Sequence, residues 1–430
     1  MSIKIIETFS GIGSQAKAFE KIKKKHPDIE YEVVATVEWE IGALYAYDII
    51  HNGKQDLSIY EKETRDDLVN FLKAFNLSSD GKVPIKESTL KRMPLIQLKA
   101  IKYSIERNNN LVDISAVRAE ELPDADLLTY SFPCQDLSIS SYWHNNFSGI
   151  EKGIDNRSGL LWEIERILHE YIDIDKKLPR FLLMENVSAI HGPLHNKNFK
   201  LWRKELEKMG YKNRYYDLDA TDFGIPQSRV RTFMISVYVD DLEPEQVNSV
   251  LRFFEITSLN GVGVPAPIGN FLKLDYSSEI YLNEAIQSTP NDTVSRQKIG
   301  NGSVVLARGK NPSDTHIAKT ITTKQDRYPN AGIILHDKEF GVNKAFYRNL
   351  TPRETFLLMG FEEKDFQQLI DNNILVSQSR KMLSHSKLLK LAGNSIVVNI
   401  LENIFLELIA LKETIIDSTS DSLTFENKYL

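Results

Sequence analysis

The chain has 430 residues, of which 42% are hydrophobic and 26% charged, with a formal net charge of −6 at pH 7. These values are ordinary for a globular protein of two or three domains and exclude one that binds polyanions over its whole surface, so any nucleic-acid site has to be local. No apolar run approaches the ~20 residues of a membrane span and no signal-peptide pattern opens the sequence, which favours a cytoplasmic protein without a membrane partner.

The first predicted unit is a strand, a turn and a helix. Residues 3–8 form an apolar run typical of a buried strand, and an amphipathic helix follows from about residue 14. The turn between them, Phe9-Ser10-Gly11-Ile12-Gly13, lets the backbone approach a ligand at a helix N-terminus, although a glycine turn also occurs without any ligand. A second strand over residues 31–37 completes a right-handed βαβ unit. We therefore expect an α/β fold with a doubly wound sheet.

Acidic and aromatic residues follow the predicted strand ends. Glu38 and Trp39 come directly after the second strand, where an acid can bond ribose hydroxyls and an indole can face an adenine. Asp113, in a third predicted strand over residues 111–114, can accept a hydrogen bond from an exocyclic amine. Such an adenosine site without a basic pyrophosphate clamp favours S-adenosylmethionine over NAD, and Ala16 replaces the third glycine of Gly-x-Gly-x-x-Gly.

Residues 54–108 interrupt the alternation of strands and helices. The stretch is rich in Lys, Asp and Leu and is largely helical in pattern, so we predict a helical insertion at the rim of the sheet. A plain solvated insertion without a function gives the same pattern. Beyond it, strands are expected at residues 126–130, 181–184 and 232–237, with helical segments between them. This order predicts a mostly parallel sheet covered on both faces.

The only cysteine, Cys134, follows the strand over residues 126–130 and is preceded by Pro133. One thiol cannot form an internal disulfide or a multi-cysteine metal site, so it either packs as a small apolar side chain or acts as a nucleophile or redox group. Glu185 comes directly after the strand at 181–184 and should emerge at the same sheet edge. An acid at a strand end is also commonly a solvated residue or a helix cap.

Three polar residues occur at every second position between residues 227 and 231. Gln227, Arg229 and Arg231 are expected on one face of a strand by their period of two, a pattern that exposed strand faces also show. Gly393-Asn394-Ser395 is interpreted as a turn that leads into the last helix.

Changes in the residue pattern divide the chain into two domains. Residues 1–245 carry the strand and helix pattern of the first domain. From about 250 to 345 glycines and prolines become frequent and short β-like pieces replace helical periodicity, which predicts a smaller, irregular, β-rich domain. Residues 346–415 are expected to return to the first domain and complete it.

These motifs closely resemble those of the DNA cytosine-5 methyltransferases found in bacterial restriction-modification systems. The resemblance runs from Ile5 to about Leu406, apart from the insertion and the variable part of the second domain. It is carried by Phe9-Ser10-Gly11-Ile12-Gly13, Glu38-Trp39, Asp113-Ile114, Phe132-Pro133-Cys134-Gln135, Glu185-Asn186-Val187, Gln227-x-Arg229-x-Arg231, Arg348 to Phe361 and Gly393-Asn394-Ser395. Two features depart from the family pattern: Ser14 replaces a second consecutive glycine, which would loosen the turn slightly, and the spacing from Cys134 to Glu185 is longer than usual.

The resemblance implies a methyltransferase fold with a target-recognition domain, and methyl transfer to C5 of a flipped-out cytosine in a short duplex DNA sequence. Cys134 would attack C6, Glu185 would hold or protonate N3, Arg231 would bind O2, and Arg229 would add positive potential. The implied cofactor-binding residues are Phe9, Gly11, Ile12, Gly13, Glu38, Trp39, Asp113, Ile114, Pro133, Leu160, Asn394 and Ser395.

The DNA-facing surface is predicted in residues 296–330. This segment holds seven Lys or Arg and two Asp, a local charge of +5 in a chain of −6, although a solvated basic loop would look the same. A polar segment from Ser138 to Arg157 is expected to close over the flipped base. The candidate DNA contacts are Gln135, Ser138, Gln227, Arg308, Lys310 and Lys324.

The resemblance also implies the partners. We expect a monomer that acts on double-stranded DNA, with a cognate restriction endonuclease that shares the site but need not bind. An RNA cytosine-5 methyltransferase of the same architecture is the main alternative. An inactive DNA-binding module and a nicotinamide oxidoreductase are further ones, while the single cysteine excludes a zinc deaminase. No metal site is expected.

Overall fold

The computed structural model describes most of the chain, and Cys134, Gln135, Ser138 and nearly all of the predicted closing segment lie outside the described residues. The described residues are 2–133, 157–257, 259, 261, 263–313, 316–336 and 340–417.

A six-stranded sheet with the order β2-β1-β3-β4-β7-β5 forms the centre of the larger domain. Strands β1 to β4 run parallel, and β7 lies antiparallel to both of its neighbours, β4 and β5. This topology confirms the predicted doubly wound, mostly parallel α/β fold. The strands are β1 (Ser2–Thr8), β2 (Glu30–Val37), β3 (Leu127–Tyr130), β4 (Phe181–Asn186), β5 (Tyr211–Asp219) and β7 (Val230–Tyr238).

The strand predictions differ from the structure at two places. Residues 111–114 form no strand, because only an isolated bridge joins Asn110 to Thr36 before Val112 turns the backbone away with a φ of 64°. Strand β5 was not predicted, because it pairs only with β7 at the edge of the described sheet and its mostly polar residues lack a continuous apolar run.

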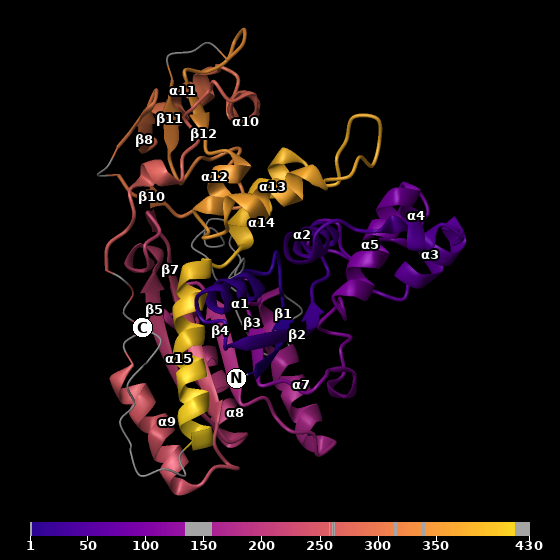
Figure 1. Ribbon diagram of the computed structural model, residues 1–430, viewed down its shortest axis with the longest axis vertical. Coiled ribbons are helices and arrows are strands. Elements are labelled where there is room, and N and C mark those ends of the chain that lie inside the picture. The colour runs from indigo at the N-terminus through magenta and orange to yellow at the C-terminus, as the bar shows by residue number, and fades with distance from the viewer. Residues whose placement is uncertain are drawn as a thin grey trace.

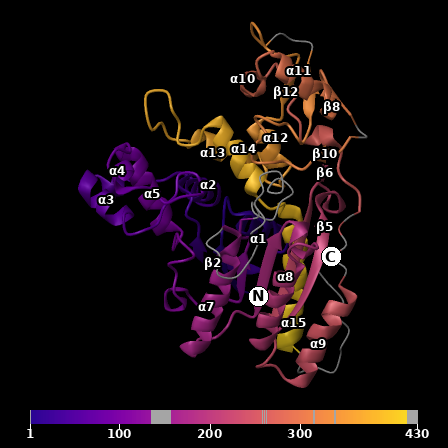
Figure 2. The same cartoon turned by 180° about the vertical axis from the view of Figure 1, so that it is seen from behind.

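Helices cover both faces of the sheet. Figure 1 shows α1 (Ser14–Lys25) and α15 (Val398–Asp417) in front of the strands, and Figure 2, seen from behind, shows α7 (Leu161–Asp173) and α8 (Asn196–Lys208) on the other side. Each face of the sheet has its own apolar core, the first under α1 and α15 and the second under α7 and α8. Side chains alternate between them: Ile5 of β1 belongs to the first core and Ile6 to the second. The rings of Phe19 and Phe405 stack 4.2 Å apart between α1 and α15, so the end of the chain packs on its beginning.

The apolar segment His385–Ile416 is long enough and apolar enough to cross a membrane by length and composition. Of its most apolar window, 83% is buried inside the protein. It spans α14 (His385–Asn394) and α15, and this burial is what core helices show.

The predicted insertion is helical and is fixed to the larger domain. It contains η1 (Leu57–Tyr60), α3 (Arg65–Leu72), α4 (Glu87–Leu90) and α5 (Leu95–Arg107), and it extends to one side of the sheet (Figure 1). Arg107 donates to the fully buried carboxylate of Asp48 on α2 (Ile41–Asn52) through two nitrogens, at 2.6 and 2.8 Å. A two-pronged bond of this kind gives the insertion a defined orientation.

The small domain, defined here as residues 279–349, holds a four-stranded sheet of order β12-β11-β8-β9. It is less β-rich than predicted, since two helices accompany the strands, and residues 250–256 belong to α9, which packs on the larger domain. The bounds are α9 (Pro244–Ile256), α10 (Glu279–Ser288), α11 (Val294–Asn301), β8 (Val305–Arg308), β9 (Asn311–Pro312), β11 (Ile333–Leu335) and β12 (Tyr347–Asn349).

Short elements join the two domains. The parallel pair β6 (Gln227–Ser228) and β10 (Ala318–Lys319) links the larger domain to the small one. Between the small domain and α14 lie α12 (Pro352–Leu357) and α13 (Glu363–Asp371). The remaining 3₁₀ turns are η2 (Ala119–Glu121), η3 (Arg157–Leu160), η4 (Ser188–His191), η5 (Ala220–Phe223) and η6 (Ile268–Asn270).

Glu7 makes the stability of the sheet depend on pH. It lies fully buried in β1, and burial raises its pKa to about 8 against an opposing contribution from Tyr47. A carboxyl whose pKa is higher in the folded chain than in the unfolded one stabilises the fold at low pH, and this contribution is lost as the pH rises. We expect wild type to lose about 2 kcal/mol relative to Glu7→Gln between pH 6 and pH 8.

Denaturant unfolding at the two pH values measures this difference. Glu32→Gln, an exposed position on the neighbouring strand β2, is the control and should follow wild type. A parallel pH dependence of wild type and Glu7→Gln would contradict a neutral buried Glu7.

Candidate active site at the carboxyl edge of the sheet

The carboxyl ends of β1 to β4 meet at one edge of the main sheet, because these strands are parallel and adjacent. Phe9 follows β1, Glu38 follows β2 and Pro133 lies three residues beyond β3, while Glu185 is the penultimate residue of β4. The edge therefore brings together residues that are far apart in the sequence. In open α/β sheets, ligands bind outside this edge.

The turn after β1 adopts left-handed backbone conformations. Phe9, Gly11 and Gly13 have φ angles of 55°, 56° and 78°. A Cβ on Gly13 would stand 2.1 Å from Nε2 of His51, so only glycine fits there. Burial lowers the pKa of His51 to about 4, and the neutral ring donates from Nε2 to the carbonyl of Ile12 at 3.0 Å. At Gly11, by contrast, a Cβ would meet no described atom within 4 Å, so space is open above the turn.

Glu38 is held in place from both its side chain and its backbone. Its carboxylate accepts hydrogen bonds from the N–H of Gly11 at 3.0 Å and of Glu40 at 2.8 Å. Burial raises the pKa of Glu38 to about 7. Asn110 bonds the main-chain N–H and carbonyl of Glu38, both at 3.1 Å. Sequence reasoning missed Asn110, whose only signal is its place at the end of the Asn108-Asn109-Asn110 run.

Asp113 lies in a turn beside β2 and not at a strand end. One carboxylate oxygen accepts from the backbone and hydroxyl of Ser115, and the other accepts from Nδ2 of Asn76 at 2.7 Å. The neighbouring Ile114 is buried in the second core, while Trp39 is partly buried and packs against the first.

The segment that leads to Cys134 is tied to both neighbouring strand ends. Nδ2 of Asn186 donates to the carbonyl of Phe132 at 3.0 Å, and the Ser131 hydroxyl lies 3.5 Å from the carbonyl of Phe9. Sequence reasoning gave Asn186 no role of its own. Leu160 is partly buried where α7 begins. A narrow crevice reaches Glu185 here, lined by Gln15, Thr129, Tyr130, Ser131, Leu183, Glu185, Ile396 and Leu401.

Glu185 and Arg231 form an ion pair at this edge. Nε of Arg231 lies 3.4 Å from a carboxylate oxygen of Glu185, and the two side chains are only 16% and 13% exposed. Burial raises the pKa of Glu185, while Arg231 and then Arg229 act to lower it. The balance leaves an acid that keeps its proton to higher pH than an ordinary glutamate.

The predicted row of Gln227, Arg229 and Arg231 is not one strand face. Gln227 is in β6, Arg231 is in β7, and the strand is broken at Arg229. The buried amide of Gln227 donates to the carbonyl of Leu358 at 2.8 Å and accepts from the N–H of Ile321 at 2.9 Å. These bonds correct the prediction that Gln227 faces DNA, because its buried amide is hydrogen-bonded to the backbone of the protein itself.

Arg229 is likewise turned inward. Its guanidinium donates to the carbonyls of Ile321 at 2.9 Å, Gly393 at 3.1 Å and Ser395 at 2.8 Å. It therefore joins the larger domain, the small domain and the end of α14, and it reaches Glu185 through its charge.

Gly393 and Asn394 end α14 and Ser395 caps it, which corrects the predicted turn. Asn394 is exposed, whereas the hydroxyl of Ser395 lies 2.7 Å from the hydroxyl of Ser14. The residue that departs from the family pattern therefore ties the start of α1 to the end of α14.

The small domain presents basic side chains. Arg308, Lys310 and Lys324 are all exposed, and Lys310 lies 3.7 Å from the carboxylate of Asp275. A hollow of about 430 Å³ opens next to Lys324, lined by Ser295, Arg296, Ile299, Lys324, Arg327 and Tyr328. Cationic and aromatic side chains in one hollow suit contact with nucleic acid.

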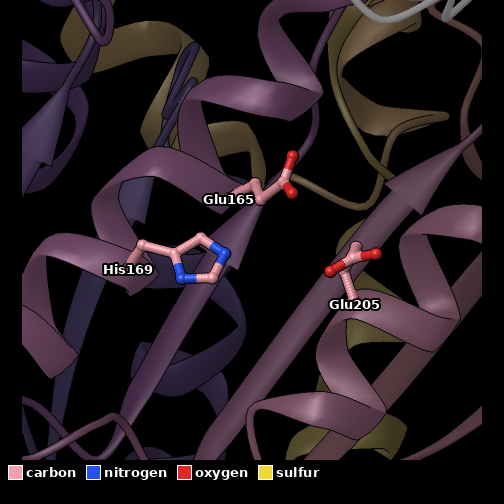
Figure 3. A group of neighbouring side chains, drawn as sticks. All are labelled: Glu165, His169 and Glu205. Carbon is pink, nitrogen blue, oxygen red and sulfur yellow. The ribbon is translucent and has the colours of Figure 1, made fainter.

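A further group of polar side chains lies away from the edge. Glu165 and His169 project from successive turns of α7 toward Glu205 on α8 (Figure 3), with candidate ligand atoms within 4.8 Å of one another. The carboxylate of Glu205 is paired with Lys208 at 2.8 Å. Glu205 and Lys208 are both on α8, so this ion pair lies within one helix and balances the charge of Glu205.

Comparisons with known proteins agree on one family. The family model described as C-5 cytosine-specific DNA methylase matches residues 96–410. Orphan methyltransferase M.SssI of Spiroplasma monobiae is 34% identical over 415 residues, which cover 94% of this chain and 96% of the relative. Type II methyltransferase M2.ScrFI of Lactococcus lactis subsp. cremoris is 32% identical over 407 residues, covering 94% and 99%.

Solved structures share the fold at low identity. The crystal structure of S. pombe Dnmt2 methyltransferase matches with a TM-score of 0.56 at 19% identity and covers 95% of this chain and 99% of its own. The Entamoeba histolytica methyltransferase EhMeth gives 0.54 at 16%, covering 98% and 100%.

Replacing Arg229 tests its role as the joint between the domains. We expect Arg229→Met to lower the free energy of unfolding by about 3 kcal/mol or more, because three carbonyls, two of them in buried hydrogen bonds, lose their donor. Denaturant unfolding measures the loss, with Arg380→Met at an exposed position as the matched control. Equal stabilities for the two variants would show that Arg229 does not join the domains.

Proposed function

The chain belongs to the C-5 cytosine-specific DNA methylase family, and we propose that it transfers a methyl group from S-adenosylmethionine to C5 of a cytosine within a short duplex DNA sequence. The observation that carries this proposal is the largely buried Glu185–Arg231 pair, which lies at the same sheet edge as residues 131–133, directly before Cys134 in the sequence. An acid with a raised pKa beside a cation suits a pyrimidine ring that gains electrons during the reaction.

The residues at the edge fit the cofactor. The carboxylates of Glu38 and Asp113 can accept from ribose hydroxyls and an adenine amine, Trp39 offers an aromatic face, and the turn is open at Gly11. Phe9, Ile12, Gly13, Ile114, Pro133, Leu160, Asn394 and Ser395 are proposed to complete the site. When bound, S-adenosylmethionine supplies an electrophilic methyl group.

The protein's own groups activate the cytosine. The thiolate of Cys134 forms a bond to C6, and the displaced π electrons make C5 nucleophilic while Glu185 holds a proton at N3 and Arg231 contacts O2. After C5 has gained the methyl group, loss of the C5 proton returns an electron pair to the ring and expels the thiolate. A stacked base cannot enter this site, so the cytosine has to be flipped out, and the segment from Ser138 to Arg157 is proposed to close over it.

We propose that DNA binds the exposed basic side chains of the small domain. Arg308, Lys310 and Lys324 are exposed there, and the hollow beside Lys324 adds Arg296 and Tyr328. These side chains are proposed to contact phosphates and base edges, with Gln135 and Ser138 nearer the target base. The family suggests a cytoplasmic monomer that protects host DNA from a restriction endonuclease.

Cys134→Ser tests the chemistry. We expect methyl transfer to duplex DNA to fall on the order of 10³-fold or more, because a hydroxyl is a far weaker nucleophile toward C6. Bisulfite mapping of DNA from cells that express each form measures new 5-methylcytosine. An assay with RNA in place of DNA tests the alternative substrate, and methylation of RNA alone, or full activity of Cys134→Ser, would overturn the proposal.

The pH dependence of the rate reports on Glu185. Because the pKa of Glu185 is raised, we expect kcat/KM to decline as the pH rises through that pKa and Glu185 loses its proton. Arg231→Gln removes the cation that opposes the rise in the pKa of Glu185. The decline in kcat/KM should therefore move to higher pH, although the overall rate falls. Rate profiles from pH 6 to pH 10 with Glu185→Gln as the control measure the effect. A decline at the same pH in Arg231→Gln would argue against this pair.

A further inference from the structure

A loop of the helical insertion lies directly against the end of β2. Ser78 is fully buried, its N–H donates to the carbonyl of Trp39 at 2.7 Å, and its carbonyl accepts from the N–H of Ile41 at 2.9 Å. A parallel bridge pairs Ser78 with Glu40. The loop therefore extends the backbone pairing of β2 past its end, at the point where Glu38 and Trp39 leave the sheet.

The hydroxyl of Ser78 also shapes the loop itself. It donates to the carbonyl of Val83 at 2.7 Å and accepts from the N–H of Gly81 at 3.0 Å. Gly81 has a left-handed φ of 72°, and a Cβ there would lie 4.0 Å from Nε1 of Trp39. The tight turn thus packs beside the indole.

Two lysines of α14 fasten the same loop to the larger domain. Nζ of Lys390 donates to the carbonyl of Asp80 at 2.7 Å and to the buried carboxylate of Glu40 at 2.8 Å. Nζ of Lys387 donates to the carbonyl of Ser79 at 3.1 Å. Because these contacts come from two separate segments, residues 39–41 and α14, the loop has a fixed position at the edge.

Asn76 connects the loop to Asp113. Its Nδ2 lies 2.7 Å from one carboxylate oxygen of Asp113, whose other oxygen accepts from Ser115. Each carboxylate oxygen has two lone-pair sites, so the carboxylate can still accept a further hydrogen bond. A carboxylate that is already oriented loses less freedom when a ligand binds.

On the basis of the proposed function, we propose that the insertion forms the adenosine side of the S-adenosylmethionine site and that Asn76 is a positioning residue for Asp113. The insertion is then part of the cofactor site and not a solvated addition to the rim. Its loop contacts Trp39 and Glu40, which directly follow Glu38, and it also contacts Asp113. Trp39 and Asp113 are the proposed adenine contacts.

Binding of S-adenosylhomocysteine to the full chain, measured by titration calorimetry, tests the proposal without requiring turnover. We expect Asn76→Ala to weaken binding about three- to tenfold through loss of one hydrogen bond to a carboxylate. In steady-state assays the KM for S-adenosylmethionine should rise by the same factor, while kcat and the KM for DNA stay unchanged. Asn70→Ala, at an exposed asparagine of α3 in the same insertion, is the matched control and should bind as wild type does.

A double-variant cycle shows whether Asn76 acts through Asp113. In an Asp113→Ala background, Asn76→Ala should weaken binding no further. Independent, additive losses would overturn the positioning role, and so would unchanged binding by Asn76→Ala. Thermal unfolding of each variant identifies a loss that comes from misfolding. If wild type itself fails to bind S-adenosylhomocysteine, the proposed function fails; if wild type and Asn76→Ala bind equally, only the role of the insertion is overturned.

Discussion

The hydrogen bonds of Arg229 hold the three parts of the molecule together. A guanidinium is the one side-chain group with five donors in a rigid fork, so it can serve the carbonyls of Ile321, Gly393 and Ser395 at the same time. Burying this cation is costly unless it is well bonded, and the three carbonyls offset that cost. The same charge partly opposes the rise in pKa that burial gives Glu185. One side chain therefore sets both the position of the small domain and part of the electrostatics of the proposed active site.

The connection continues on either side of Arg229. Gln227 bonds the backbone of Ile321, just beyond β10, and of Leu358 at the end of α12, so the segment between the sheet and the small domain is fixed to two separate parts of the chain. On the other side, Ser395 carries the connection to Ser14 at the start of α1. A continuous chain of hydrogen bonds thus runs from the small domain to the helix that begins at the glycine turn. A displacement of the small domain by DNA would have to be accommodated along this chain, because each of these groups is buried.

The sequence predicts those parts of the fold and site whose cause is local. Strands β1, β3 and β4 are apolar runs, and Glu38 and Glu185 could be placed at the carboxyl edge because parallel strands share it. Residues 111–114 have the same apolar composition, but the side chain of Asn110 bonds the backbone of Glu38 and the chain then turns away. No local pattern could show this, and the inward direction of Arg229 depends on carbonyls that are at least 92 residues away. The contact of the insertion with the carboxyl edge of the sheet is of the same long-range kind.

The departure at Ser14 illustrates why a motif has to be judged by conformation. The family pattern suggests that a serine in this place loosens the turn, but the residue that needs to be glycine is Gly13, which has a left-handed φ and no space for a Cβ beside His51. Ser14 is already the first residue of α1, where the backbone is helical and any side chain is allowed. Its hydroxyl gains a partner in Ser395 at 2.7 Å, which a glycine could not provide. Ser14 is therefore compatible with the backbone of the turn and adds a bond between the start of α1 and the end of α14, so the expected loosening of the turn has no basis in its conformation.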